Sequence, residues 1–344
     1  MIKIGLVGLG YMGTTHLDVY RQLAGKAAVV AIAEPDAKKR AGDFSGAGGN
    51  IGNRTDAPSL SGIELYESLE ALLANADVDV VDITLPTFMH RDAVLGALAA
   101  GKHAICEKPL ALDYDAAREM ADAAKQAGRS LYVGQCIRFW PAYVAARELL
   151  LGGTLGKART AAFSRVSPLP GWMWRGWARD QQKSGGAPLD LHIHDADYIS
   201  HLFGRPSAVS AFVGGRRGSS GRIDHIAACY HYPDDLLVTA VGAWEYAAGY
   251  PFSMTFSIHA DGGTLALAAD GTLALYRDGA EPETIPVAPG DGWMHELGHF
   301  VDCIAAGEPS AVISAEEAVF AVKLVMAAVE SARIGRRVEI PETP

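Results

Sequence analysis

The chain has 344 residues, of which 49% are hydrophobic and 20% are charged, a composition that excludes an intrinsically disordered protein. Two domains are expected at this length, because a single hydrophobic core rarely grows beyond about 250–300 residues. The 30 basic and 40 acidic residues give a net charge of −10, which argues against nucleic acid and anionic membranes as partners, since both attract basic surfaces.

The four cysteines, Cys106, Cys136, Cys229 and Cys303, are far apart and form no Cys-x-x-Cys pair. Such spacing is typical of reduced, buried thiols in a cytosolic protein. Apolar runs fall short of the roughly 18–20 residues that span a bilayer. Lys3 is the only early basic residue, so the N-terminus does not resemble a signal peptide. We therefore expect a cytoplasmic protein.

The chain opens with a short apolar run, Ile2–Val7, that leads directly into Gly8-x-Gly10-x-x-Gly13. In a strand–turn–helix unit the first glycine permits a tight turn, the second lets the backbone approach a pyrophosphate, and the third lets the helix pack on the strand. A helix from about Met12 to Leu23 would then hold the phosphates at its N-terminus. Taken alone, the pattern is equally compatible with an ordinary glycine turn. The residues expected to contact a dinucleotide here are Gly8, Gly10, Tyr11, Met12 and Gly13.

A second buried strand, Ala28–Ala33, ends at Glu34, about 20 residues after the last glycine of the turn. A carboxylate here accepts hydrogen bonds from the ribose hydroxyls of NAD and repels the 2′-phosphate of NADP, so we favour NAD. The basic residues Lys38, Lys39 and Arg40 follow. They could grip a 2′-phosphate, or they could form the solvated start of a helix, which we favour.

Residues 42–62 contain six glycines and indicate an exposed, flexible insertion. A phosphate-binding loop is the alternative, but no Lys-Ser or Lys-Thr pair follows the glycines. Further along, buried strands are predicted at 78–85, 103–106 and 130–133, with helices at 66–73, 92–100 and 113–126. This alternation predicts an α/β fold with a doubly wound parallel sheet, a Rossmann domain over residues 1–134.

Ligands bind such sheets beyond the carboxyl ends of the strands. Lys108 lies at such an end and is the first candidate for chemistry, because Pro109 stiffens the turn after it. A cis Lys108–Pro109 bond would aim the amine at a fixed point. An ordinary surface lysine is the alternative. The residues expected to contact the cofactor at these strand ends are Leu85, Pro86, His90, Glu107 and Lys108.

From residue 135 to residue 344 the pattern changes to that of an α+β domain. A helix is predicted at 142–151, after Arg138-Phe139-Trp140-Pro141. Alternating, turn-separated segments then predict an open, mainly antiparallel sheet. The predicted strands are 158–167, 207–213, 225–232, 236–246, 252–260 and 263–267. We expect this domain to bind the substrate.

Three tryptophans occur within the six residues Trp172–Trp177. Aromatic faces stack on the apolar faces of sugars, and arginine donates to hydroxyls or carboxylates. An aromatic cap over the hydrophobic core explains the cluster equally well. The candidate substrate residues of this segment are Trp172, Trp174 and Arg175.

Pro188 fits the first turn of a helix that carries Asp190 and His194 one turn apart. A carboxylate beside an imidazole supports a general base, because it orients the ring and stabilises its protonated form. His192-x-His194 also invites a metal site, but a helix points the two rings in different directions, so we expect no metal. A purely structural role for His194 is the remaining alternative.

Taken together, these motifs make the chain similar to the glucose-fructose oxidoreductase, inositol dehydrogenase and rhizopine-catabolism family of NAD(P)-dependent oxidoreductases. The resemblance covers nearly the whole chain. Its specific part is the combination of Glu107-Lys108-Pro109 with Asp190-x-x-x-His194. The other matching motifs are Gly8-x-Gly10-x-x-Gly13, Pro86-x-x-x-His90, Gly101-Lys102-His103, Arg138-Phe139-x-Pro141, Gly153-Thr154-Leu155-Gly156, Gly185-Gly186, Glu296 and Phe300.

The resemblance implies a dehydrogenase of a sugar or an inositol-like polyol that passes a hydride to the nicotinamide. Lys108 would ease deprotonation of the reacting hydroxyl, His194 would accept the proton, and Asp190 would bind substrate and position His194. Arg138 and the Trp172–Arg175 segment would line the substrate side. The family also implies a homodimer or homotetramer formed through the open face of the second sheet.

Two departures from the family pattern bear on the site. Ala187-Pro188 follows Gly185-Gly186 where many relatives carry a third glycine, and the insertion at 42–62 is longer than usual. Two other functions stay open: an NAD-dependent glycoside hydrolase, which the family includes, and a non-catalytic dinucleotide-binding sensor.

Overall fold

The structure is a computed structural model that describes residues 1–44, 48–49, 58–171, 173–214, 221–233, 235–244 and 246–341. The chain forms two compact units. The first unit comprises Met1–Gln135, Pro170–Ser184 and Trp293–Phe320. The second unit comprises Cys136–Leu169, Gly185–Gly292 and Ala321–Pro344. Two short stretches from the later part of the chain therefore pack with the N-terminal unit.

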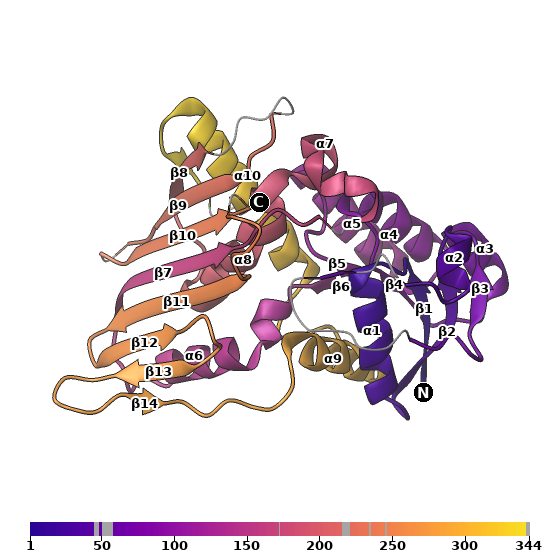
Figure 1. Ribbon diagram of the computed structural model, residues 1–344, viewed down its shortest axis with the longest axis horizontal. Coiled ribbons are helices and arrows are strands. Elements are labelled where there is room, and N and C mark those ends of the chain that lie inside the picture. Colours follow the sequence, from indigo (N-terminus) through magenta and orange to yellow (C-terminus); the bar gives the residue numbers. More distant parts are fainter. Residues whose placement is uncertain are drawn as a thin grey trace. The chain divides into compact units, whose positions relative to one another are not determined.

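The first unit is built on a six-stranded sheet in the order β3-β2-β1-β4-β5-β6, and every neighbouring pair is parallel (Figure 1). This order confirms the doubly wound sheet expected from the alternation of strands and helices. The central strands are buried on both faces, which explains their nearly continuous apolar sequences. The strands are β1 Ile2–Val7, β2 Ala27–Ala33, β3 Glu64–Tyr66, β4 Val80–Ile83, β5 His103–Glu107 and β6 Leu131–Gly134.

Helices cover both faces of this sheet (Figure 1). One face is covered by α3, α4 and α5, which pack side by side, and the other by α1 and the later helix α9. Local signals set their ends: Asp113 accepts the N–H of Ala116 at the start of α5, and Gly128 closes that helix in the left-handed conformation. The helices of this unit are α1 Tyr11–Gln22, α2 Ala37–Arg40, α3 Leu69–Asn75, α4 His90–Ala99, α5 Tyr114–Ala127, α7 Gln181–Ser184 and α9 Gly292–Ala306.

One prediction in this unit was wrong. The helix expected over 66–73 begins only at Leu69, because Ser68 caps it by accepting the N–H of Ala71. Tyr66 instead ends the edge strand β3, which pairs with β2. The segment 42–62, which we expected to be a flexible insertion, lies largely outside the described residues.

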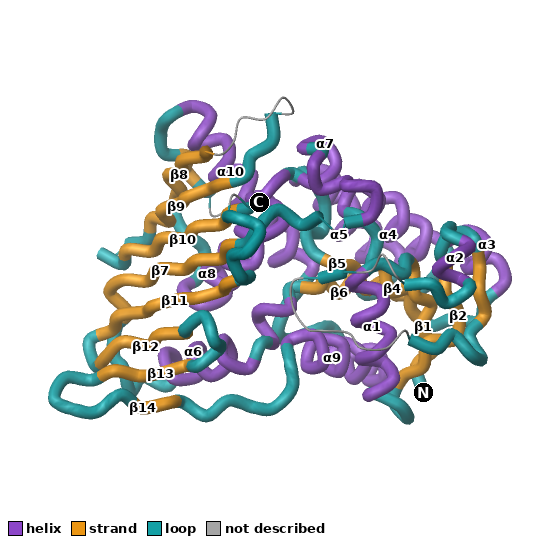
Figure 2. The backbone as a smooth tube through the Cα atoms, viewed as in Figure 1, coloured by secondary structure: helices purple, strands orange, loops and turns teal. Residues whose placement is uncertain are grey.

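The second unit contains a nine-stranded sheet in the order β14-β13-β12-β11-β7-β10-β9-β8-β15 (Figure 2). Only β7 and β10 run parallel, so the sheet is mixed and mainly antiparallel, as predicted. Three short strands, β13, β14 and β15, were not expected. The strands are β7 Ala158–Val166, β8 Ala208–Gly214, β9 His225–His231, β10 Leu237–Ala243, β11 Ser253–Ala260, β12 Gly263–Leu267, β13 Leu273–Tyr276, β14 Glu283–Thr284 and β15 Val338–Glu339.

Three helices complete the second unit: α6 Pro141–Leu151, α8 Ile193–Phe203 and the C-terminal part of α10 Ala315–Ile334. Helix α8 packs against β7 and β10 at the middle of the sheet. The hydroxyl of Ser331 in α10 accepts the backbone N–H of Ala211 in β8 at 3.0 Å. In the part of the chain that the structure describes, no helix is long and apolar enough to cross a membrane.

Candidate active site

The glycine turn adopts the strand–turn–helix form that the sequence predicts. Gly8 has φ of +94°, a left-handed conformation that a side chain would strain. A Cβ on Gly13 would lie 1.9 Å from the carbonyl oxygen of Gly8, so only glycine allows α1 to approach β1 this closely. A Cβ on Gly10 would meet nothing within 4 Å, so its missing side chain serves no internal packing. That open space at the start of α1 fits a ligand that approaches the backbone.

Glu34 is fixed beside this turn. Its buried carboxylate accepts the N–H of Leu9 at 2.7 Å and the N–H of Asp36 at 2.9 Å. The ammonium of Lys39 lies 3.8 Å from the same carboxylate. Arg40 donates to the carbonyl of Glu34 at 2.6 Å and pairs with Glu67 at 2.8 Å. Lys39 and Arg40 therefore both contact acidic residues at the end of β2 or beside it, which supports NAD over NADP.

The turn after β5 carries Lys108. The Lys108–Pro109 peptide bond is cis, as the sequence suggested, and the Lys108 side chain is half-buried. The backbone N–H of Lys108 donates to the carboxylate of Glu107 at 3.0 Å. Glu107 is itself buried, so its carboxylate belongs to the interior of the first unit.

His90 has a different environment from that of a residue in direct contact with a cofactor. Its side chain is buried at the start of α4. One ring nitrogen lies 2.9 Å from the carbonyl oxygen of Pro109, and the other lies 2.8 Å from that of Leu85. The ring therefore ties the end of β4 to the turn that holds Lys108, which gives His90 a positioning role.

A buried charged network beneath the Lys108 turn was not found from the sequence. The ring of His16 in α1 lies 2.8 Å from Asp82 and 3.1 Å from Glu107. Tyr20 donates to the same oxygen of Asp82 at 2.8 Å. Burial alone would lower the pKa of His16, but the two carboxylates outweigh it and raise that pKa to about 10. His16 is therefore an imidazolium at neutral pH. The one signal in the sequence is Asp82, a charged residue inside an otherwise apolar strand.

In the second unit, Pro188 starts the helix that carries the candidate base. Residues Pro188–His192 form a wider, π-helical turn, and α8 continues from Ile193. The regular i, i+4 spacing expected for Asp190 and His194 is thus altered at its start. Asp190 is half-buried, whereas His194 is buried, with 8% of the residue exposed.

The neighbouring histidine is structural. His192 is completely buried, and its Nε2 lies 2.7 Å from the hydroxyl of Tyr230. Burial, together with the charge of Arg165, lowers the pKa of His192 to about 3, so the ring is neutral. Within the described ranges no group of three or more His, Cys, Asp or Glu side chains is arranged to hold a metal ion.

Arg138 is buried in the second unit rather than open to a substrate. Its guanidinium makes a two-point ion pair with Asp197, with both N–O distances 2.8 Å, and its remaining terminal nitrogen lies 3.2 Å from His201. Both partners of the ion pair are almost fully buried. Arg138 therefore anchors helix α8 to the segment before α6, and the substrate contact expected from the sequence does not fit this environment.

The tryptophan-rich segment belongs to the first unit. Trp172 lies outside the described residues. Trp174 is 38% exposed, and the guanidinium of Arg175 lies 4.6 Å above its ring. Arg175 has φ of +49°, in the left-handed region that non-glycine residues seldom adopt. Trp174 therefore presents an aromatic surface and Arg175 a cation, the chemistry expected of a sugar-binding segment.

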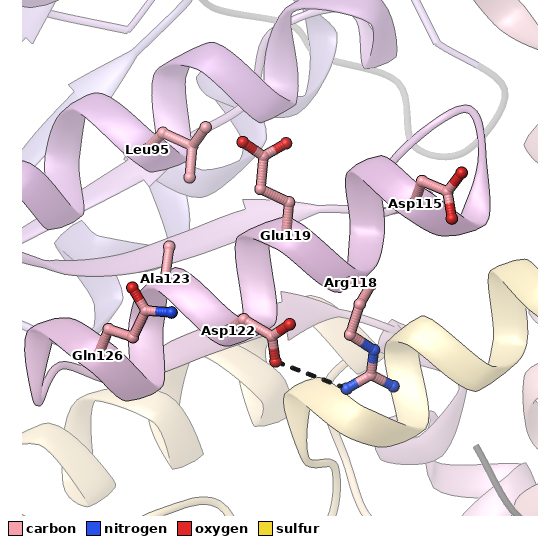
Figure 3. Close-up of a pocket in the computed structure, with 7 residues that line it drawn as sticks. All are labelled: Leu95, Asp115, Arg118, Glu119, Asp122, Ala123 and Gln126. Carbon is pink, nitrogen blue, oxygen red and sulfur yellow. Dashed lines mark ion pairs between the residues drawn. The ribbon is translucent and has the colours of Figure 1, made fainter.

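A shallow hollow lies elsewhere on the first unit, over helices α4 and α5 (Figure 3). Arg118 there pairs with Asp122 at 3.9 Å and with Glu316 at 2.6 Å. The candidate cofactor and substrate residues do not line this hollow, so we assign it no ligand. Its lining residues are Leu95, Asp115, Arg118, Glu119, Asp122, Ala123 and Gln126.

Comparisons with known proteins match both parts of the chain. Residues 2–135 match the family model described as "Oxidoreductase family, NAD-binding Rossmann fold". Residues 143–266 match the model described as "GFO/IDH/MocA C-terminal domain". The N-terminal part of the chain is thus an NAD-binding Rossmann domain.

Two curated relatives and one solved structure illustrate the similarity. The chain is 28% identical to 2,7-anhydro-N-acetylneuraminate hydratase of Escherichia coli (strain K12) over 73% of its own length but only 63% of that protein's. It is 28% identical to 1,5-anhydro-D-fructose reductase of Ensifer adhaerens, over 79% of this chain and 83% of the relative. The solved complex of levoglucosan dehydrogenase with NADH and levoglucosan has the same fold, with a TM-score of 0.82, 22% identity and coverage of 99% and 100%.

Proposed function

The chain belongs to the glucose-fructose oxidoreductase, inositol dehydrogenase and rhizopine-catabolism family, and on that premise we propose that it is an NAD-dependent dehydrogenase of a sugar or polyol. The reaction transfers a hydride between a secondary alcohol of an inositol-like substrate and the nicotinamide. The single observation that carries this proposal is the hydrogen bond between Glu34 and the glycine turn of the first unit. The carboxylate of Glu34 accepts the backbone N–H of Leu9 in the turn that precedes α1.

The residues of the glycine turn fit a dinucleotide. Gly13 and Gly8 bring the start of α1 against the end of β1, and Gly10 leaves open space beside that helix start. Tyr11 and Met12 form the first turn of α1, where the helix dipole favours a pyrophosphate. Glu34 would accept hydrogen bonds from the ribose hydroxyls. At the ends of the following strands, the residues that would contact the nicotinamide half are Leu85, Pro86, Glu107 and Lys108.

The catalytic roles rest on three side chains. When bound, the nicotinamide exchanges the hydride with the carbinol carbon. Lys108 donates to the reacting hydroxyl oxygen and stabilises its negative charge as the proton leaves. His194 accepts that proton as general base, and Asp190 binds the substrate and orients His194.

The tryptophan-rich segment and the relatives support this substrate class. Trp172, Trp174 and Arg175 offer aromatic stacking and a cation, which suit a polyhydroxylated ring. One relative is named a reductase of 1,5-anhydro-D-fructose, and the solved neighbour was crystallised with levoglucosan. We do not include Arg138 among the substrate contacts, because its guanidinium lies in a buried ion pair.

The experiment is spectroscopic. Purified protein is mixed with NAD and a panel of inositols, aldoses and anhydrosugars, and NADH absorbance is followed. Turnover of at least one member supports the proposal. Absence of turnover on every member, with NAD binding demonstrated separately by calorimetry, would count against it.

A second function has one observation in its favour. The relative from Escherichia coli is named a hydratase, not a dehydrogenase, so an activity without net oxidation is a real alternative. An NAD-dependent glycoside hydrolase would release the leaving group from a chromogenic glycoside while NADH absorbance stays flat. The dehydrogenase proposal expects NADH to accumulate and no leaving group to appear.

We also propose that the protein is a cytoplasmic homodimer or homotetramer assembled through one face of the nine-stranded sheet. The strand register places Phe212, Leu237 and Tyr276 on the same face, and all three are exposed. Exposed large apolar side chains on one face of a sheet are typical of a protein–protein interface. Light scattering of the wild type and of Phe212→Asp tests this proposal, since a charge on the interface should lower the measured mass.

A further inference from the structure

We propose that His16 is a positioning residue for Lys108, acting through the carboxylate of Glu107. This inference rests on the proposed dehydrogenase function, in which Lys108 contacts the reacting hydroxyl. It assigns this role to a residue of α1, the helix that follows the glycine turn. The path consists of two bonds, one from His16 to Glu107 and one from Glu107 to the backbone of Lys108.

The first bond fixes the Glu107 side chain. Oε1 of Glu107 lies 3.1 Å from Nε2 of His16, and both side chains are buried. The other ring nitrogen of His16 is 2.8 Å from Asp82, so the ring bridges Asp82 in β4 and Glu107 in β5. With two acceptors on opposite edges, the imidazolium has one orientation that satisfies both.

The charge balance shows why this ring is needed. Two buried carboxylates close to each other repel strongly in a medium of low dielectric constant. The imidazolium of His16 offsets that repulsion, and Tyr20 adds a hydrogen bond to Asp82. Without His16, that repulsion would act unopposed on the Glu107 side chain and displace the oxygen that faces Lys108.

The second bond carries the constraint to the reacting residue. Oε2 of Glu107 accepts the backbone N–H of Lys108 at 3.0 Å. Gly134 in β6 makes room for this carboxylate, since a Cβ there would lie 3.3 Å from its carbon. On the far side of Lys108, the carbonyl of Pro109 lies 2.9 Å from His90. The residues before and after Lys108 are therefore each tied to a buried histidine, one from α1 and one from α4.

A displacement of about 1 Å in a catalytic group costs up to about 100-fold in rate. We therefore expect His16→Gln to lower kcat by about 10- to 100-fold while the Kd for NAD stays near that of the wild type. The backbone amide of Lys108 should exchange with deuterium about tenfold faster or more, whereas amides of β1 keep their protection. Amide exchange requires no substrate and no turnover.

A double-mutant cycle separates this role from a general loss of packing. Glu107→Met removes the link and leaves the His16–Asp82 pair, so the protein should fold even if His16→Gln does not. If His16 acts only through Glu107, adding His16→Gln to Glu107→Met changes kcat and the Lys108 exchange rate no further. Tyr20→Phe is the matched control: it removes a hydrogen bond to Asp82, spares the His16–Glu107 contact, and should leave Lys108 exchange unchanged.

The outcomes are distinct. Unchanged Lys108 exchange in a folded His16→Gln protein overturns the positioning role, as do strictly additive effects in the cycle. If the wild type turns over no substrate of the panel, the proposed function fails, but the exchange rates still decide whether His16 holds the Lys108 turn.

Discussion

The carboxylate of Glu34 accepts the backbone N–H of Leu9 at 2.7 Å, so the end of β2 is tied directly to the glycine turn that follows β1. Glu34, which we expect to bind the ribose hydroxyls, is thus held in place by the same turn that we expect to bind the pyrophosphate. Its second oxygen accepts the N–H of Asp36. Both oxygens are oriented by the backbone, which favours a preformed site for the adenosine half of NAD.

Replacing Glu34 should change the cofactor preference. Glu34→Ala removes the acceptor for the ribose hydroxyls and releases Lys39, whose ammonium lies 3.8 Å away, to meet a 2′-phosphate. Loss of a hydrogen bond to a charged group costs about 1.5–3 kcal/mol, so NAD should bind about 10- to 100-fold more weakly. NADP affinity should rise. Calorimetric titration with both cofactors measures this, and Glu67→Gln, an exposed acid beside Arg40, should leave the ratio unchanged. An unaltered NAD-to-NADP ratio in Glu34→Ala would remove Glu34 from cofactor selection.

The glycines of the turn offer a matched pair of substitutions. Gly10→Ala adds a methyl group that meets no protein atom within 4 Å, so thermal stability should be kept. NAD affinity should fall about tenfold or more, equal to about 1.4 kcal/mol, because the methyl group occupies the space for the pyrophosphate. Gly13→Ala forces a Cβ to 1.9 Å from the Gly8 carbonyl and should lower stability by about 3 kcal/mol or more. Calorimetric melting and NAD titration of both variants check this. A stable Gly10→Ala that binds NAD normally would contradict the expected phosphate site.

Sequence reasoning was strongest where the signal is local. The glycine turn, the acid after β2 and the alternation of strands and helices are short-range patterns, and they were sufficient to predict the parallel sheet. Pro188, which marks the start of the helical segment that carries Asp190, is also a short-range signal. The edge strand β3 was missed because three residues are too few to show a period.

The role of a side chain could not be predicted from the sequence where it depends on a partner far away in the chain. The family resemblance implied that Arg138 lines the substrate side, but its guanidinium pairs with Asp197, 59 positions further along the chain. His16 is likewise 66 positions from Asp82. Buried charges need partners, but only the fold decides which partners meet. The composition of residues 170–184 likewise gave no sign that this segment packs with the first unit.

Removing the Lys108 amine should impair chemistry rather than cofactor binding. Lys108→Ala should lower kcat by about 10²–10⁴-fold, the range typical of a lost catalytic hydrogen-bonding or proton-transfer group. The Kd for NAD should stay close to that of the wild type, since the glycine turn and Glu34 are untouched. Steady-state kinetics and calorimetry provide the two numbers. Lys125→Ala in α5 is the control for loss of one positive charge, and unchanged turnover in Lys108→Ala would exclude Lys108 from the mechanism.

The buried ion pair of the second unit predicts an effect on stability. Arg138→Met leaves the Asp197 carboxylate buried and unpaired, which should destabilise the protein by about 3–5 kcal/mol. The double variant Arg138→Met/Asp197→Leu should recover most of that loss, because no buried charge is left behind. Urea unfolding of the two variants and the wild type gives the comparison. If Arg138 instead contacts substrate, the single variant keeps its stability and raises KM.

The protonated state of His16 predicts how stability depends on pH. Burial lowers the pKa of His16, but Asp82 and Glu107 raise it more, to about 10, whereas the unfolded chain titrates near 6.5. Below pH 6.5 both states carry the proton and its stabilising contribution is complete. Between pH 6.5 and about 10 only the folded state keeps the proton, so the free energy of unfolding should fall as pH rises, by up to about 1.4 kcal/mol per pH unit from this group. His16→Gln lacks the titrating ring and cannot show this slope. Urea unfolding of both proteins at pH 6, 7.5 and 9 isolates the contribution of His16 to the free energy of unfolding, because the other titrating groups are common to both. Parallel stability curves over that window would show that His16 is not protonated in the folded state.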